Sequence, residues 1–216
     1  LGGLLFFRGA WAVKLDHTYP RLSNYYLAWT LTDAQARAIS RNDVVVLDME
    51  IQKRQPQMIK KIRNLNPDIV LLVYITPQEI IKDANSSYSL FRKQLASGIK
   101  NDYYLQNSKG QKIGWWPGTH MLNVTDQDFQ NYFVDFVVGD LLSSGFWDGV
   151  YYDNAWDNIA WFVGTDIDFD LNGKVDSSLD AKWRDGLKVI YNETRRITND
   201  KYLIVGNNET IHYSEE

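Results

Sequence analysis

One unit recurs along this chain: a short apolar stretch with a polar residue at its end, followed by a helical pattern. Five stretches have the character of strands, and they are residues 25–29, 44–49, 69–75, 149–152 and 202–206. Strands that alternate with helices are typical of a parallel sheet, because each helix carries the chain back to the start of the next strand. We therefore expect five parallel strands in sequential order, with their carboxyl ends on one shared rim.

The number of units limits the architecture. A closed (β/α)8 barrel has eight units and needs about 250 residues or more, whereas this chain has 216 residues. We expect an α/β fold, namely a TIM-type barrel that is incomplete, with about five βα units. Either the chain is a fragment that lacks its last three units, which we favour, or its sheet stays open. We assign residues 1–19 to an N-terminal extension and residues 20–216 to the barrel domain, with its C-terminal units missing.

Capping and breaking residues mark the expected helix boundaries. Thr32 precedes an alanine-rich run and is typical of a helix N-cap, and Pro56 suits the first turn of the helix after the second strand. We expect longer helices over residues 126–142, with Thr125 as the cap, and over residues 179–197. Between the third strand and the first of these helices, turn-forming residues predict a long excursion with a small hairpin.

The composition excludes several classes of protein. The chain is 44% hydrophobic and 14% aromatic, which is enough to fill a sizeable core. A net charge of -4 argues against a nucleic-acid partner, because phosphate binding needs a basic face. The absence of cysteine excludes disulfides and thiolate metal sites. No apolar run reaches the roughly 20 residues that a transmembrane helix requires, so we expect no membrane span.

The fourth strand carries the most informative polar residues. Gly149 to Tyr152 is short, β-branched and aromatic, as in an inner strand that is covered on both faces. Asp153 and Asn154 follow at the point where such a strand meets the rim, and α/β barrels place their chemistry there. The alternative is that Asp153 only caps the following loop or helix.

Five stretches carry a family resemblance, and they are Asn-Tyr-Tyr (24–26), Val-Val-Leu-Asp (45–48), Trp-Asp-Gly-Val-Tyr-Tyr-Asp-Asn (147–154), Asp-Phe-Asp-Leu-Asn-Gly (168–173) and Trp-Arg-Asp-Gly (183–186). Together they resemble the glycosyl-hydrolase-like TIM barrels, near the endo-α-1,4-polygalactosaminidases and, more distantly, the α-galactosidase-like barrels. The resemblance covers about residues 20–212, and its most specific element is the string before Asn154 together with the Asp-rich loop that follows. It implies hydrolase chemistry without fixing a substrate. In the α-galactosidase-like barrels the carboxylate after the fourth strand is the nucleophile, and the resemblance implies this role for Asp153.

Glycoside hydrolysis normally needs two carboxylates, one on each side of the scissile bond. They stand about 5 to 5.5 Å apart in retaining enzymes and about 6.5 to 9.5 Å apart in inverting enzymes. The rim candidates are Asp48, Glu50, Asp153 and Glu209. We expect Asp153 to be catalytic, with Glu209 as its first partner and Asp48 as the next. The alternative for Asp48 and Glu209 is that each binds neighbouring loop amides or an arginine side chain.

Side chains that suit sugar binding follow the predicted strands. Aromatic rings stack on the apolar face of a pyranose, and amides offer paired donors and acceptors. We expect substrate binding by Trp29, Glu50, Tyr74, Trp115, Trp116, Asn154, Trp156, Asn207 and Asn208. The Trp115-Trp116 pair precedes Pro-Gly in a loop, which favours a binding role. Tyr26 and Tyr152 alternate with apolar residues, which favours core packing instead.

An Asp-rich segment matches the first nine positions of an EF-hand calcium loop. The side chains of Asp168, Asp170, Asn172 and Asp176 and the carbonyl of Lys174 would supply the oxygen ligands. The Glu expected at the twelfth position is absent, since Leu179 stands there. We expect structural calcium that stiffens this rim loop, and the alternative is a turn that only caps the next helix. No nucleotide-binding fingerprint is present, so no organic cofactor is expected.

These patterns together predict a glycoside hydrolase that acts on a polysaccharide or oligosaccharide through rim carboxylates. The alternatives are a catalytically inactive carbohydrate-binding barrel and a calcium-dependent surface module. The apolar opening of the chain is compatible with the remnant of a signal segment and equally with a buried first strand. The first interpretation favours a secreted or cell-surface protein. The sequence makes no prediction of the oligomeric state.

Overall fold

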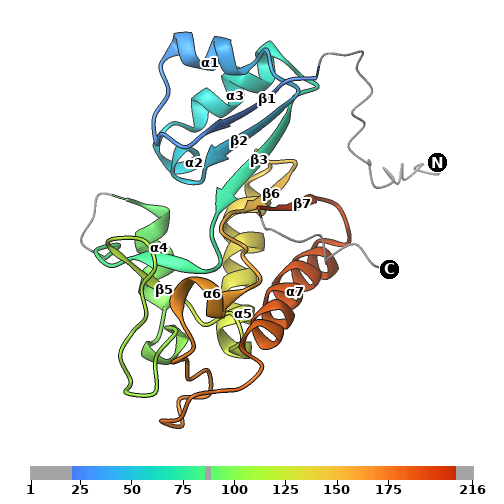
Figure 1. The fold of residues 1–216 in the computed structure, drawn as a ribbon. Coiled ribbons are helices and arrows are strands. Elements are labelled where there is room, and N and C mark those ends of the chain that lie inside the picture. The colour runs from blue at the N-terminus through green and yellow to red at the C-terminus, as the bar shows by residue number, and fades with distance from the viewer. Residues whose placement is uncertain (1–20, 86–88, 208–216) are drawn as a thin grey trace, which may run out of the picture.

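A five-stranded parallel sheet forms the centre of the molecule (Figure 1). The computed structural model describes residues 21–85 and 89–207. The strands of the sheet are β1 (Ser23–Tyr26), β2 (Val44–Asp48), β3 (Val70–Ile75), β6 (Gly149–Tyr152) and β7 (Leu203–Gly206), in the order β1-β2-β3-β6-β7. Every neighbouring pair is parallel. The prediction of five parallel strands in sequential order is confirmed.

The sheet stays open over the part of the chain that the structure describes. Its edge strands are β1 and β7, and they do not pair with each other. The α/β class and the sequential parallel topology are therefore as expected, while a closed barrel is not formed by these residues. The predicted extension over residues 1–19 lies outside the described residues, and the domain boundary stays a prediction.

Helices connect the strands and follow local sequence signals. They are α1 (Asp33–Ile39), α2 (Glu50–Arg54), α3 (Pro56–Leu65), α4 (Phe91–Gly98), α5 (Gln127–Phe136), α6 (Ile159–Val163) and α7 (Leu179–Thr198), with short 3-10 turns at Asn101–Tyr103 and Leu142–Ser144. Thr32 caps α1 through a capping box with Gln35, and Pro56 occupies the first turn of α3. None of the helices in the described residues is long and apolar enough to cross a bilayer.

The start of α5 differs from the expectation. The cap is Asp126, whose side chain accepts the Phe129 N–H at 2.7 Å. Thr125, the expected cap, instead donates its hydroxyl to the Asn123 side chain at 2.7 Å. The Thr125 hydroxyl is therefore used outside the helix, and the carboxylate of the next residue caps α5. The helix continues as a π-turn over Val137–Leu141.

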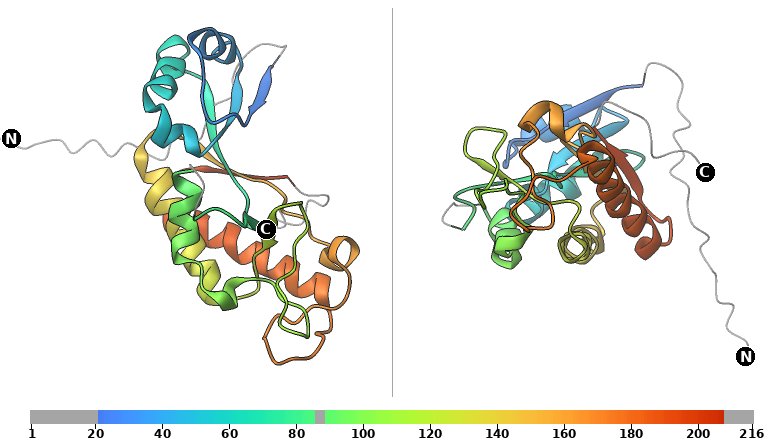
Figure 2. Two further views of the ribbon diagram at one scale, coloured as in Figure 1. Left: turned by 90° about the vertical axis from the view of Figure 1, so that its left-hand side faces the viewer. Right: turned by 60° about the horizontal axis from the view of Figure 1, so that its bottom comes forward.

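The two faces of the sheet are covered unequally. Side chains alternate between the faces of a strand. One set packs under the helices in the main core and includes Val45, Leu47, Leu71, Val73, Val150 and Tyr152. The other face carries only a small buried cluster of Val46, Val70 and Leu72. Helices α4, α5 and α7 pack in succession on the well-covered side (Figure 2).

The alternation also positions polar residues at the carboxyl ends of the strands. Asp48 shares a face with Val46, Tyr74 with Leu72, and Asp153 with Tyr151. These side chains therefore lie on the less covered face. In the excursion after β3, β4 (Glu79–Ile81) pairs antiparallel with β5 (Thr119–Met121). Because α4 lies between these strands in the chain, they form a small two-stranded sheet and are not the small hairpin that the sequence predicts. This sheet adds further side chains beyond the end of β3.

Candidate active site at the sheet rim

Asp153 lies where β6 ends and is held by its two neighbouring strands. Its backbone N–H donates to the Ile75 carbonyl at 2.9 Å. One carboxylate oxygen accepts the Tyr74 hydroxyl at 2.9 Å, and the other accepts the Asn207 side-chain amide at 2.7 Å. The residue is 9% exposed. No described lysine, arginine or histidine forms an ion pair with it, so neutral donors alone fix its orientation.

Three tyrosines surround the Asp153 carboxylate. The Tyr25 ring packs edge-on against Tyr74 and Tyr151, with centroid distances of 5.9 and 5.5 Å. Burial raises the pKa of all three hydroxyls, and the negative charge of Asp153 raises it further. The hydroxyls therefore stay protonated and remain donors over the whole physiological pH range.

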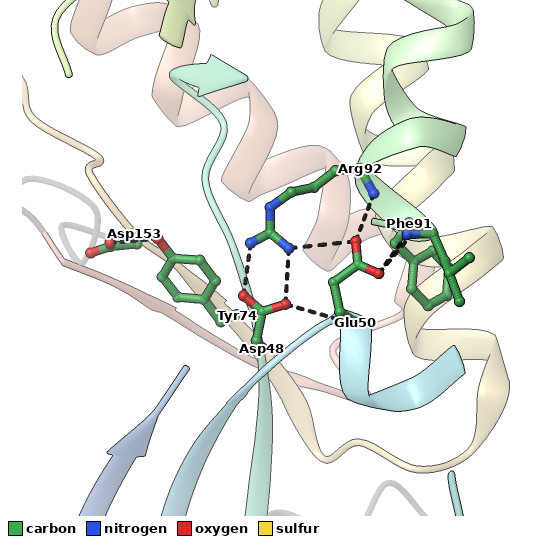
Figure 3. Close-up of polar contacts among 7 residues, drawn as sticks. Asp48, Glu50, Tyr74, Phe91, Arg92 and Asp153 are labelled. Atoms are coloured by element: carbon green, nitrogen blue, oxygen red, sulfur yellow. Dashed lines mark hydrogen bonds and ion pairs between the residues drawn. The ribbon is translucent and has the colours of Figure 1, made fainter. Parts of the chain in front are cut away.

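Asp48 is engaged in a buried ion pair. Its two oxygens accept bidentate hydrogen bonds from the Arg92 guanidinium at 3.0 and 2.7 Å, and the residue is 2% exposed (Figure 3). The fork of the guanidinium matches the carboxylate geometry, which makes the pairing specific. The alternative that the sequence left open for Asp48, an arginine partner, is what the structure contains.

Glu50 is fully buried and caps the beginning of α4. Its carboxylate accepts the backbone N–H groups of Leu90, Phe91 and Arg92 at 2.7, 3.2 and 2.9 Å. The Arg92 guanidinium also approaches it at 3.5 Å. All lone pairs that face the helix are used, and no surface is left for a sugar. Trp29 belongs to the same cluster, since the Arg92 guanidinium lies over its ring at 5.1 Å.

Three of the expected sugar-binding tryptophans, Trp115, Trp116 and Trp156, form one aromatic cluster. Trp115 lies 5.1 Å from Trp116, 6.0 Å from Trp156 and 5.2 Å from Phe162, measured between ring centroids. Trp116 is 53% exposed and presents its ring to solvent, while Trp115 is half-buried. Residues from the excursion and from the loop after β6 thus meet in this cluster.

The asparagines that follow β6 and β7 have defined partners. Asn207 donates to Asp153, as described above. Asn154 adopts a left-handed conformation with φ 51°, which asparagine tolerates better than most residues. Its side-chain amide donates to Glu79 at 3.0 Å. Asn208 and Glu209 lie outside the described residues, so their predicted roles stay predictions.

Glu79 is a site residue that the sequence reasoning did not select. It lies in β4, four residues beyond the end of β3, is 8% exposed, and borders a pocket of about 130 Å³ that Tyr74 and Arg92 also line. Burial raises the pKa of the Glu79 carboxyl, and the charge of Asp153 also raises it. Hydrogen bonds from the side chains of Thr119 and Asn154 and from the Trp116 backbone lower it, and the net shift is upward. A survey of every acid within a few residues of a strand end would have found it.

The Asp-rich loop brings acidic oxygens together. Asp168, Asp170 and Asp176 each offer a carboxylate oxygen within 4.8 Å of the others. Asp168 accepts the backbone N–H groups of Asn172 and Gly173 at 3.1 and 2.7 Å, and Gly173 has the positive φ of 82° that this tight turn needs. These hard oxygen ligands suit calcium.

Two features of the loop differ from an EF-hand. Asp176 forms an ion pair with Lys182, which competes with a cation. Asp180, the nearest acid to the twelfth position, accepts the Ala160 N–H at 2.9 Å and so points toward α6. Lys174 donates its N–H to the Asn172 side chain at 2.9 Å, and its carbonyl stays a predicted ligand.

Comparison with known proteins identifies the family. The hypothetical glycosyl hydrolase family 15 matches residues 63–215. The chain belongs to this family. This confirms the resemblance that the sequence motifs indicated. No curated protein sequence matches the chain.

Solved structures of glycoside hydrolases share the fold. The glycoside hydrolase domain of PelA from Pseudomonas aeruginosa is 11% identical, with a TM-score of 0.56 over 86% of this chain and 58% of that one. The GH36 α-galactosidase AgaA from Geobacillus stearothermophilus is 14% identical, with a TM-score of 0.57 over 87% and 28%. Ega3 from Aspergillus fumigatus, in complex with galactosamine, is 15% identical, with a TM-score of 0.52 over 84% and 57%.

These likenesses concern architecture. At such identities they show a shared fold and carry no substrate or catalytic residue over to this chain. The chain spans less than two thirds of each of these structures.

Proposed function

We propose that this chain is part of a glycoside hydrolase that cleaves O-glycosidic bonds in a polysaccharide or oligosaccharide, with Asp153 as the reactive carboxylate. One observation carries the proposal. Asp153 lies at the carboxyl end of a central strand, held by the Tyr74 hydroxyl and the Asn207 amide and without a cationic partner among the described residues. A carboxylate that is oriented but not neutralised keeps the charge that attack on a sugar, or stabilisation of an oxocarbenium ion, requires.

The residues around Asp153 would assist in distinct ways. The hydroxyl of Tyr74 and the amide of Asn207 fix the direction of the carboxylate before the substrate binds. The low polarity of the tyrosine cluster strengthens its electrostatic effect on a developing positive charge. The Trp115, Trp116 and Trp156 cluster would stack on sugar rings.

Glycoside hydrolysis needs a second carboxylate, and we choose it from the partners of Asp153 that the sequence predicts, Glu209 and Asp48. Asp48 is neutralised by Arg92, and we assign it a structural role. Glu209, which follows β7 in the sequence, is our proposed partner of Asp153. The proposal that the mature protein is secreted or located at the cell surface rests on the sequence alone.

A catalytically inactive carbohydrate-binding barrel is the second candidate. The observation in its favour is that Asp48, the second sequence candidate within the described residues, is buried and paired. The third candidate, a calcium-dependent surface module, would rest on the acidic loop. We propose that this loop binds calcium in a structural role through the oxygens of Asp168, Asp170, Asn172, Lys174 and Asp176.

Exposing the full-length protein to a panel of neutral, acidic and amino-sugar polysaccharides separates these functions. The measurement is the release of new reducing ends, together with calorimetric binding of the same glycans. A hydrolase releases reducing ends from at least one glycan. Binding without release, at any pH tested, contradicts the proposal and supports the binding barrel. Binding that requires calcium and occurs without release supports the surface module.

A further inference from the structure

The hydroxyl of Thr119 lies between two oxygen atoms. Its Oγ1 is 2.9 Å from Oε2 of Glu79 and 2.9 Å from the carbonyl oxygen of Trp116. Both are hydrogen-bond distances for oxygen pairs. A threonine hydroxyl carries a single hydrogen and can donate only once.

The number of hydrogens available for these two contacts therefore depends on whether the Glu79 carboxyl is protonated. If Glu79 is ionised, the hydroxyl hydrogen bridges one contact and the other brings two oxygen atoms together with no hydrogen between them. The Trp116 carbonyl also accepts the Thr119 N–H at 3.1 Å, so it is not left without a donor, but the unbridged contact remains repulsive. If Oε2 carries a proton, Glu79 donates to Thr119 and Thr119 donates to Trp116. The neutral form alone bridges both contacts.

The second oxygen of Glu79 is compatible with this arrangement. Oε1 accepts the side-chain amide of Asn154 at 3.0 Å, and a protonated carboxyl keeps this acceptor. Asn154 directly follows Asp153 and adopts the left-handed conformation. Glu79 thus fixes the turn that carries the Asp153 carboxylate.

The charges around Glu79 also favour the neutral form. Within the described residues no cation lies at ion-pair distance. Arg92 lines the same pocket but is committed to Asp48 and Glu50, and Tyr74 stays a neutral hydroxyl there. Along the β4-β5 pair, Lys82 and His120 alternate with Glu79 and Thr119 and so face the opposite side. Burial and the negative charge of Asp153 raise the pKa of the Glu79 carboxyl.

We propose that Glu79 is a neutral positioning residue, protonated on Oε2, that fixes the Asp153-Asn154 turn and leaves Asp153 as the ionised group on this part of the rim. This inference rests on the proposed function of Asp153. It assigns Glu79 no contact with the substrate and no proton transfer during the reaction.

Two substitutions in the full-length protein test the role of Glu79. In Glu79→Gln the amide oxygen still accepts from Asn154 and the NH2 group still donates to Thr119, so it mimics the neutral acid. We expect the kcat of this variant to stay within about twofold of wild type. Wild-type activity should decline at alkaline pH as Glu79 ionises, and this decline should be absent from the variant.

In Glu79→Ala both contacts are lost, and we expect kcat to fall about tenfold or more, the equivalent of one or two buried hydrogen bonds. A Gln variant as inactive as the Ala variant at all pH values would overturn the proposal, because Glu79 would then need its charge or its proton.

A measurement without substrate separates this inference from the proposed function. Carbon-13 NMR of side-chain carboxyls, with Glu79 assigned by its absence in Glu79→Gln, follows the protonation of this residue directly. We expect it to remain protonated above the usual range of glutamate. In addition, because the folded-state pKa is raised, protonation stabilises the fold at low pH and this stability is lost as the pH rises through the raised pKa. Glu79→Gln should therefore gain melting temperature relative to wild type on the alkaline side. Titration of Glu79 in the ordinary range would overturn the proposal whether or not any glycan is cleaved.

Discussion

Two pairs of carboxylates lie at the same end of the sheet and are treated in opposite ways. Asp48 and Glu50 follow β2, are buried, and share the Arg92 guanidinium as a cationic partner (Figure 3). Asp153 and Glu79 follow β6 and β3, and the side-chain donors to them among the described residues are neutral groups of tyrosine, threonine and asparagine. Both pairs lie at the rim, so their position does not distinguish them. They differ in that a cation neutralises the charge of the first pair only, among the described residues.

The difference indicates which carboxylates are structural and which one is open to chemistry. A buried carboxylate that is paired with a guanidinium has its charge compensated and is no longer available as a reagent. Asp153, which is held by neutral groups, has no such compensation among the described residues, and Glu79 beside it has a positioning role. The rim of this protein thus combines an ion-pair cluster that secures α4 with the proposed reactive carboxylate at the end of β6.

Removing the cation should have the largest effect on stability. Arg92→Ala leaves two buried carboxylates unpaired, and we expect the free energy of unfolding to fall by about 3–5 kcal/mol. Chemical denaturation of the full-length protein measures this. The control is Arg196→Ala, which removes an exposed ion pair with Glu193 and should leave the unfolding midpoint unchanged. If Arg92→Ala is as stable as this control, Asp48 and Glu50 do not depend on a cationic partner, and the proposed difference between the two carboxylate pairs is wrong.

Removing a neutral donor from Asp153 should affect activity more than stability. Tyr74→Phe deletes the hydroxyl that orients the carboxylate, and we expect kcat to fall about tenfold, the equivalent of one hydrogen bond to a charged group. Tyr26→Phe is the matched control, because its hydroxyl donates to the Thr30 carbonyl in an exposed position. Equal turnover in the two variants would show that Tyr74 does not orient the reactive group.

The acidic loop provides the smallest predicted effect on turnover. We expect calorimetry to show heat of binding with millimolar calcium, and Asp170→Asn to weaken this binding while kcat stays near wild type. Asp166→Asn, which alters an exposed acid outside the cluster, should bind calcium normally. No heat from the wild-type protein would remove calcium from the account, and a loss of turnover in Asp170→Asn would extend the reactive region to this loop.

The fold was largely predictable because its signals are local. Apolar strands separated by helical patterns gave the parallel order, and Pro56 marked the start of α3. The cap of α5 was wrong by one residue, since neither the pattern around Thr125 nor that around Asp126 shows which oxygen reaches the helix amides. Closure of a barrel depends on strand pairs that the described residues do not contain.

The site was predictable only in part, because the groups that bind its carboxylates lie far from them in the sequence. The place of Asp153 directly after a strand marked it as a candidate, and its catalytic role stays a prediction. The partners of Asp48 and Glu50 lie about forty residues away, at the start of α4, where Leu90 offers no side-chain cap and Glu50 supplies one instead. Glu79 gains its role from Thr119 and Asn154, which β5 and the end of β6 bring to it. No sequence spacing reveals such contacts.

The most direct test compares Asp153→Asn with Asp48→Asn in the full-length protein, by glycan turnover and melting temperature. Asn keeps the size of the side chain and removes its charge. The account predicts that Asp153→Asn keeps its melting temperature and loses turnover by about a thousandfold or more, as removal of a reactive group does. It predicts that Asp48→Asn lowers the melting temperature, while the protein that stays folded remains active. Unchanged turnover in a stable Asp153→Asn variant would contradict the central claim.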